Sequence, residues 1–282
     1  MKRLRGGPPS FLCDGNVNST GYVYLPDSVG YVFSGTICSG ESGAVPMEIP
    51  AATTPEMMDD PACSVHALRG NLRDIALLNR LLGAHAIVRR YLDQVVPVWR
   101  RRGGAVPNAL SVLDVGTGGA DVPGAIVAWA RRRQVPVRIV GIDRHPVIVG
   151  IAASSVPANH VRVVQADAAA LPFQDASFDV CLCNLALHHL TWDGRVALLR
   201  RLHAVARLGF LVVDLLRSPG GYAGVWLLTR LFRNPLTRHD GPLSVRRAMT
   251  WSEYLRCARD ADVAGLRLAR LPLFRVALSR TS

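Results

Sequence analysis

Residues 112–121 read VLDVGTGGAD, and this short stretch decides the fold. Its apolar start suits a buried strand, its glycines suit a turn, and residues 122–133 suit an amphipathic helix. Such a strand–turn–helix lets a ligand approach backbone amides at the carboxyl edge of a parallel sheet. A dinucleotide fingerprint, G-x-G-x-x-G, would need a third glycine where this chain has Asp121, whose charge would repel a pyrophosphate. The stretch therefore predicts a cofactor site, but not one for a dinucleotide.

Strands alternate with helices around this stretch. The predicted strands cover 110–115, 137–142, 161–165, 178–184 and 210–215, and the helices between them cover 122–133, 146–153 and 193–206. Near-continuous apolar strands separated by amphipathic helices indicate a parallel sheet covered on both faces. Two last apolar segments, 266–271 and 273–278, predict an antiparallel pair at the sheet edge. The fold class is therefore α/β, a Rossmann-like, doubly wound, mostly parallel sheet with a C-terminal antiparallel edge.

The chain upstream of the sheet divides into two predicted parts. Residues 1–57 hold eight Gly, six Pro and six Ser without helical periodicity, which predicts a poorly ordered extension. Residues 58–108 form an N-terminal helical segment with a break at Gly83, and Pro97 limits the second helix. Because MMDDP at 57–61 looks like a natural protein start, we expect translation to begin there; a genuine flexible extension is the alternative. The remaining domain, 109–282, carries a cap insertion at about 216–250.

The quoted stretch resembles motif I of the class I S-adenosylmethionine (SAM) dependent methyltransferases, V-L-D-[IVL]-G-x-G-x-G, with GA at 119–120 where many members have x-G. The resemblance runs from about residue 111 to the C-terminus. Later segments match the family in order: VGID at 140–143, QADA at 165–168, LPF at 171–173, SFDV at 177–180 and NLALHHL at 184–190. The last of these is similar to the segment after the fourth strand in small-molecule methylases of the ubiquinone/menaquinone group.

The resemblance implies SAM as cofactor, with Asp143 on the ribose hydroxyls and Asp167 on the adenine amino group. A carboxylate can accept hydrogen bonds from both ribose hydroxyls, and Asp114 can face the ammonium of the methionine moiety. Glycines in the turn let the backbone approach the ligand. The predicted cofactor-binding residues are Asp114, Gly116, Thr117, Gly118, Asp143, Arg144, Asp167, Ala168 and Asn184.

Methyl transfer needs a general base only when the acceptor is poorly ionised. His188 and His189 follow the fourth predicted strand, and His239 lies in the cap insertion, so these three are the candidate catalytic bases. The alternative is that His188 and His189 merely open and cap the next segment. No Cys or His spacing of a zinc site is present, and no metal is predicted.

The cap insertion suggests the acceptor. It holds an apolar run at 226–232 and a polar run at 237–241, which could close over and orient a small aromatic, quinone-like or polyketide-like molecule for O- or C-methylation. Two alternatives stay open: a methyltransferase of RNA or another polyanion, and a non-catalytic SAM-binding protein. Asn184 is followed by Leu-Ala-Leu and not by Pro-Pro-Tyr, which disfavours amino methylation of nucleic acids.

The charge is strongly basic and unevenly placed. The chain has 33 Lys+Arg against 21 Asp+Glu, a net charge of +12, and its only lysine is Lys2. Residues 216–282 alone hold twelve arginines and four acids, which predicts contact with an anionic acceptor, an acidic partner or a membrane surface. No apolar run reaches the roughly 18 residues of a membrane span, and no export signal precedes the domain. A cytoplasmic protein with reduced cysteines is therefore expected.

Overall fold

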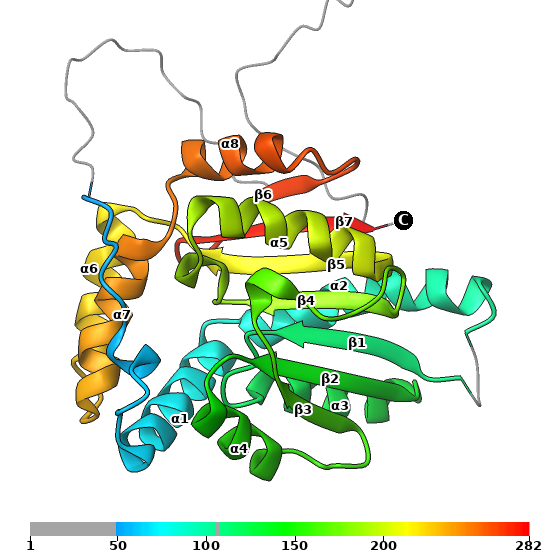
Figure 1. Cartoon of the computed structure of the whole chain (residues 1–282), viewed down its shortest axis with the longest axis horizontal. Coiled ribbons are helices and arrows are strands. Elements are labelled where there is room, and N and C mark those ends of the chain that lie inside the picture. Colours follow the sequence, from blue (N-terminus) through cyan, green and yellow to red (C-terminus); the bar gives the residue numbers. More distant parts are fainter. Residues whose placement is uncertain (1–48, 105–107, 282) are drawn as a thin grey trace, which may run out of the picture. The chain divides into compact units, whose positions relative to one another are not determined.

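The segments predicted as strands assemble into one seven-stranded sheet. The computed structural model describes residues 49–104 and 108–281. The strands are β1 (Leu110–Val115), β2 (Val137–Asp143), β3 (Val161–Gln165), β4 (Phe178–Asn184), β5 (Ala206–Leu215), β6 (Arg267–Leu271) and β7 (Arg275–Thr281). Their order is β3-β2-β1-β4-β5-β7-β6, shown in Figure 1. The first five strands are parallel and β7 is antiparallel to both β5 and β6, so the predicted fold class is confirmed.

Eight α-helices and three short 3-10 helices occur in the described part of the chain. They are η1 (Met57–Asp59), α1 (Val65–Leu81), α2 (Ala84–Arg101), α3 (Asp121–Arg133), α4 (Pro146–Ser155), η2 (Ala168–Ala170), η3 (Leu187–His189), α5 (Trp192–Val205), α6 (Pro219–Thr229), α7 (Pro235–Arg247) and α8 (Trp251–Ala261). The expectation that Pro97 limits the second helix was wrong, because α2 continues through Pro97 to Arg101. Proline removes one hydrogen bond, and burial of Val95, Val96 and Trp99 against the core holds the helix together across that gap.

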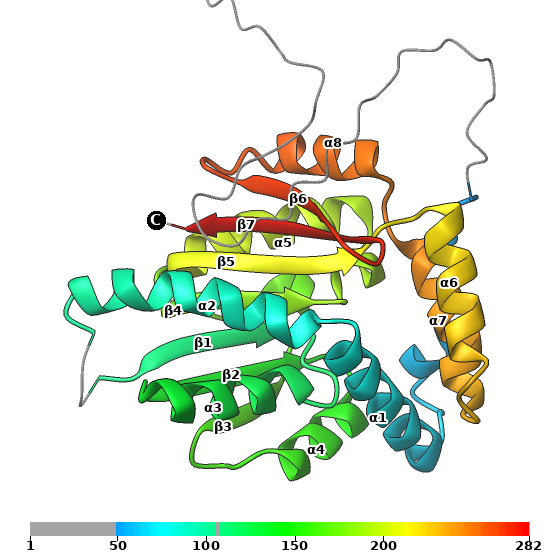
Figure 2. The ribbon, with the colours of Figure 1, turned by 180° about the vertical axis from the view of Figure 1, so that it is seen from behind.

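Helices cover the two faces of the sheet. One core is built from α2, α3 and the strand side chains that face them, such as Val112 and Ile139. The other is built from α5, α8 and the opposite strand faces, with Phe210 and Tyr254 fully buried. Figures 1 and 2 show these two layers from opposite sides. The strands between them are apolar on both faces because both faces are covered.

Three helices stand beyond the carboxyl ends of the parallel strands. The cap insertion forms α6 and α7, which pack on each other, and α7 also packs on α1 (Figures 1 and 2). Leu68 and Leu72 of α1 bury against Leu236 of α7 and Ile148 of α4. All described residues belong to one compact unit, Pro46–Ser282. Within them, no helix has the length and apolar character that crossing a bilayer requires.

The chain before α1 is closely attached to α7. Most of the predicted extension, residues 1–48, lies outside the described residues. The backbone NH of Ala52 donates to the carbonyl of Arg246 at 3.0 Å, and Glu56 is only 3% exposed. A chain that began at Met57 would therefore lack a buried carboxylate of this unit.

Candidate functional site

The loop after β1 takes a shape that depends on its glycines. Gly116 has a φ of +69°, and a Cβ there would come within 2.4 Å of the Cβ of Ala186. The residue before α3 is also left-handed, and it is Ala120, with a φ of +60°. Glycine adopts this conformation without cost, whereas alanine is strained in it. The loop thus leaves room where a ligand would pass close to the backbone.

Carboxylates end the neighbouring strands at the same edge. Asp114 is buried in β1 and accepts a hydrogen bond from the Thr117 hydroxyl at 2.7 Å. Asp143 ends β2 and accepts from the backbone NH groups of Gly118, at 3.1 Å, and His145, at 3.0 Å. Burial raises the pKa of Asp143, partly offset by those two NH groups. Asp143 therefore ties the glycine loop to the second strand.

Asp167 follows β3 and is exposed. Its Oδ1 accepts from the backbone NH of Ala169 at 2.9 Å and caps η2. Its Oδ2 makes no hydrogen bond with the described residues, so this oxygen is available to a ligand amino group. Asp114 and Asp143 lie in β1 and β2, and Asp167 lies just after β3. The three acids therefore share one edge of the sheet, because parallel strands present their carboxyl ends there.

One cavity of about 240 Å³ opens at this edge. All nine residues predicted to bind the cofactor line it, and so do His188 and His189. His239 does not line it: this side chain is 51% exposed and lies on the outer side of α7. Aliphatic side chains from α1 and α6 line another part of the same cavity: Leu72, Ile75, Leu78, Leu82, Val225 and Leu228. The cavity therefore joins a polar part near the glycine loop to an apolar part under the cap.

The polar part of the cavity fits SAM. Asn184 lines it with a buried Oδ1 that has no hydrogen-bond partner in the described residues, so an acceptor is free for a ligand donor. Ribose hydroxyls, an ammonium and an adenine amino group are all donors, and Asp114, Asp143 and Asp167 supply acceptors for them. The acid-rich strand ends suit a cationic cofactor better than a phosphorylated one.

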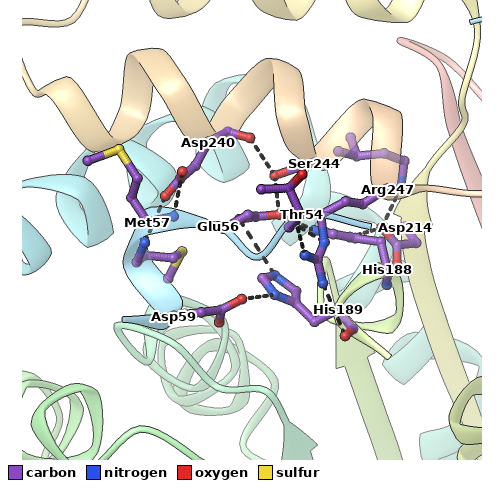
Figure 3. A network of polar contacts seen from close by, with 12 residues as sticks. Thr54, Glu56, Met57, Asp59, His188, His189, Asp214, Asp240, Ser244 and Arg247 are labelled. Carbon is purple, nitrogen blue, oxygen red and sulfur yellow. Dashed lines mark hydrogen bonds and ion pairs between the residues drawn. The ribbon is translucent and has the colours of Figure 1, made fainter. Parts of the chain in front are cut away.

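Two histidines after β4 lie in a network of carboxylates, shown in Figure 3. The His188 ring is buried, with Nδ1 2.7 Å from Asp214 Oδ1 and Nε2 3.5 Å from Glu56 Oε1. Burial lowers the pKa of His188, but the carboxylates of Asp214 and Glu56 outweigh burial and raise this pKa to about 10. His188 therefore holds its proton at neutral pH and acts as a fixed imidazolium.

His189 lies nearer the open space. Its Nδ1 is 3.1 Å from Asp59 Oδ2, its Nε2 is 3.8 Å from Glu56 Oε2, and its side chain is 19% exposed. Burial by itself would raise the pKa of Asp59, but the contacts with His189 and Arg144 lower it further than burial raises it. The Asp59 carboxylate therefore stays charged. A charged carboxylate on Nδ1 fixes the orientation of the His189 ring, and His189 lines the cavity.

The sequence did not point to Glu56, Asp59 or Asp214 as site residues. Glu56 and Asp59 come from the segment near the predicted start, and only packing against α7 brings them to the histidines. Asp214 carried a signal, since it is an acid inside the apolar run of β5. Glu56, His188 and His189 offer ligand atoms within 4.8 Å of one another, as a metal site would. The His188 imidazolium and Arg247, 3.8 Å from Glu56, already supply positive charge there.

A Rossmann-like sheet with a glycine loop and strand-end acids defines a class of protein that binds an adenosyl cofactor at its carboxyl edge. The family model for a methyltransferase domain matches residues 112–209. The chain therefore contains a methyltransferase domain, and its sheet has the fold of the class I SAM-dependent methyltransferases.

Individual relatives are distant. The chain is 37% identical over 110 residues to the demethylmenaquinone methyltransferase of Thermus thermophilus, covering 36% of this chain and 43% of that protein. The match thus spans less than half of the relative's length. Human N-acetylserotonin methyltransferase, solved with SAM, aligns with a TM-score of 0.52 and 16% identity over 78% of this chain and 56% of that one. Magnesium protoporphyrin IX methyltransferase from Synechocystis PCC 6803, solved with SAH, aligns with a TM-score of 0.43 and 18% identity, covering 68% and 83%.

Replacing Asp143 by alanine should weaken SAM binding about 10- to 100-fold, because a hydrogen bond to a charged group contributes about 1.5–3 kcal/mol. Calorimetric titration with SAM measures this. Asp193→Ala is the matched control, since Asp193 is an exposed acid at the start of α5 that does not line the cavity. An Asp143→Ala protein that binds SAM as tightly as the control would contradict this role.

SAM affinity should also rise with pH through neutrality. Burial, assisted by the charges of Asp121 and Asp143 and opposed by the Thr117 hydroxyl, raises the pKa of Asp114 to about 7. Only the ionised carboxylate attracts an ammonium, so affinity should increase up to about tenfold between pH 6 and pH 8. Titrations at several pH values check this, with Asp114→Asn expected to flatten the dependence. An unchanged slope in that variant would assign the effect to another group.

Proposed function

We propose that this chain transfers the methyl group of SAM to a small apolar acceptor of aromatic, quinone-like or polyketide-like structure, by O- or C-methylation. The observation that carries the proposal is the single cavity that joins the polar cofactor end to an aliphatic end under α6. An apolar acceptor is favoured by Leu78 of α1, by Leu82 just after that helix, and by Val225 and Leu228 of α6. The partial similarity to a menaquinone-pathway relative supports the same class of acceptor.

The chain's residues would divide the work between binding and proton transfer. SAM supplies an electrophilic methyl group on a sulfonium. Asp143, Asp167 and Asn184 hold the cofactor, and the cap excludes water from the reacting groups. His189 Nε2 accepts the proton of a phenol or enol acceptor, with Asp59 keeping the ring oriented. His188 keeps its proton and positions η3 through Asp214.

A methyl-label screen tests the proposal. Purified protein is incubated with SAM labelled in the methyl group and, separately, with a metabolite extract and with total RNA. Label is expected in a small, organic-soluble product. Label in RNA alone would overturn the small-molecule assignment, and SAM binding without label in either fraction would favour a non-catalytic protein.

The alternative, methylation of RNA or another polyanion, is supported by one observation, the twelve arginines in residues 216–282. It predicts RNA binding that weakens steeply with salt. Filter binding with total RNA at several salt concentrations separates the two functions. We also propose a reducing, cytoplasmic setting, which four free cysteines, three of them buried, support among the described residues.

A further inference from the structure

The outer surface of the cap carries a second feature, separate from the cofactor cavity. A groove of about 520 Å³ runs between α6 and α7 on the side facing away from the cavity lining. We call this groove the outer groove. The residues that line it include Tyr222, Trp226, Arg230, Arg233, Arg238 and Arg246. Four arginines and two aromatic rings thus meet on α6, α7 and the short connection between them (Figures 1 and 2 show α6 and α7).

The outer groove is positively charged without internal compensation. No ion pair joins Arg230, Arg233 or Arg238 to a carboxylate of the described residues, and Arg230 stacks over the Trp226 ring at 4.8 Å. The one acid within residues 216–250 is Asp240. It is 3% exposed and accepts from the backbone NH groups of Met57 and Met58. An anionic partner would therefore meet no opposing charge there.

Apolar side chains stand next to these arginines in solvent. Leu231 is 78% exposed, Leu227 is 66% exposed and Trp226 is 43% exposed. Leu227 directly precedes Leu228, which lines the cavity, and Leu81 of α1 is 68% exposed beside the lining residue Leu82. Large apolar side chains this exposed, interleaved with arginines, are typical of a surface that lies in the headgroup region of a bilayer.

We propose that the outer groove and Leu227 and Leu231 dock this protein on an anionic lipid bilayer. The arginines bind lipid phosphates, and the leucines and Trp226 enter the interface. The arginines could also bind the phosphates of an RNA, but an RNA would leave Leu227 and Leu231 exposed to water. The exposed leucines therefore favour a bilayer. This inference extends the proposed function, because an apolar acceptor dissolved in the bilayer would then reach the cavity beside α6.

Vesicle co-sedimentation tests the docking without any methyl transfer. The full chain is mixed with phosphatidylcholine vesicles, with or without about 30% phosphatidylglycerol, at salt concentrations from about 50 mM to about 500 mM. Binding is expected only with phosphatidylglycerol, and it should weaken as salt rises. Each arginine near the surface contributes about fivefold to the affinity for anionic vesicles. The double variant Arg230→Glu/Arg233→Glu should therefore weaken vesicle binding at least about 25-fold. Leu227→Ser/Leu231→Ser should weaken it while leaving the charge unchanged.

The matched control reverses the same charge elsewhere. Arg131→Glu/Arg132→Glu alters two exposed arginines at the end of α3, away from the cap, and should leave vesicle binding within about twofold. If the control lost as much vesicle affinity as Arg230→Glu/Arg233→Glu, net charge alone would explain the binding and the proposal would be overturned. Wild-type binding to RNA or to free inorganic phosphate with none to vesicles would overturn it too. Each variant is also titrated with SAM, which separates a failure of the docking proposal from a failure of the proposed function. Variants that only impair docking should bind SAM like the wild type.

Discussion

Replacing His189 by glutamine should lower kcat about 10²- to 10⁴-fold for a phenolic or enolic acceptor, the range typical of losing a general base. His189 lines the cavity and is partly exposed, and a carboxylate of Asp59 fixes its Nδ1 at 3.1 Å. Glutamine fills similar space but cannot take the proton. SAM affinity should change little, since the substitution leaves all the predicted cofactor-binding residues in place. Steady-state kinetics with the acceptor found by the methyl-label screen measure the effect.

The control for this prediction is His239→Gln. His239 was a candidate base by sequence, but its side chain is 51% exposed and lines the outer groove. We expect its kcat within about twofold of the wild type. If His189→Gln retained full activity on an acceptor with a hydroxyl pKa near 10, the acceptor would be ionised by other means and His189 would be structural.

Replacing Asp214 by asparagine should lower the free energy of unfolding by about 3–5 kcal/mol, the usual cost of breaking a buried ion pair. Asp214 is fully buried, and its two oxygens accept from the His188 ring at 2.7 Å and from the His188 backbone NH at 2.8 Å. Asparagine would leave the imidazolium without this partner and present an NH₂ group to a donor. Urea unfolding monitored by circular dichroism measures the loss.

Asp93→Asn is the comparison for that loss. Its pair with Arg133 spans 3.0 Å at the surface, with the two side chains 38% and 58% exposed, so its removal should cost no more than about 1 kcal/mol. The pH dependence gives a second check. Because the pKa of His188 is raised to about 10 in the folded state, the pair's contribution is complete below about pH 6.5 and is lost as pH rises toward 10. The difference in free energy of unfolding between wild type and Asp214→Asn should narrow over that pH range. A difference that stays constant would contradict a charged His188 paired with Asp214.

Local pattern was enough to predict the core of this protein. The apolar strands, the glycine turn at 116–118 and the acids Asp114, Asp143 and Asp167 all depend on residues near one another in the sequence. A parallel sheet then brings its strand ends to one edge, so the cofactor side of the cavity follows from the order of the elements. Pro97 was misjudged because helix propensity counts less than the burial of neighbouring side chains.

The side of the cavity that holds the two histidines was decided by tertiary structure alone. Glu56 and Asp59 contact His188 and His189 across more than a hundred residues, and no short-range pattern predicts that contact. The neighbours His239 and Asp240 line different spaces, the outer groove and the cavity, although their side chains are hydrogen-bonded at 2.8 Å. The sequence therefore determined the sheet, the loop and the strand-end acids, whereas packing of the N-terminal segment and the cap decided which polar groups surround the two histidines in the cavity. The physical reason is that a strand's end is set by its own residues, but a buried charge network is set by which distant segments share the space.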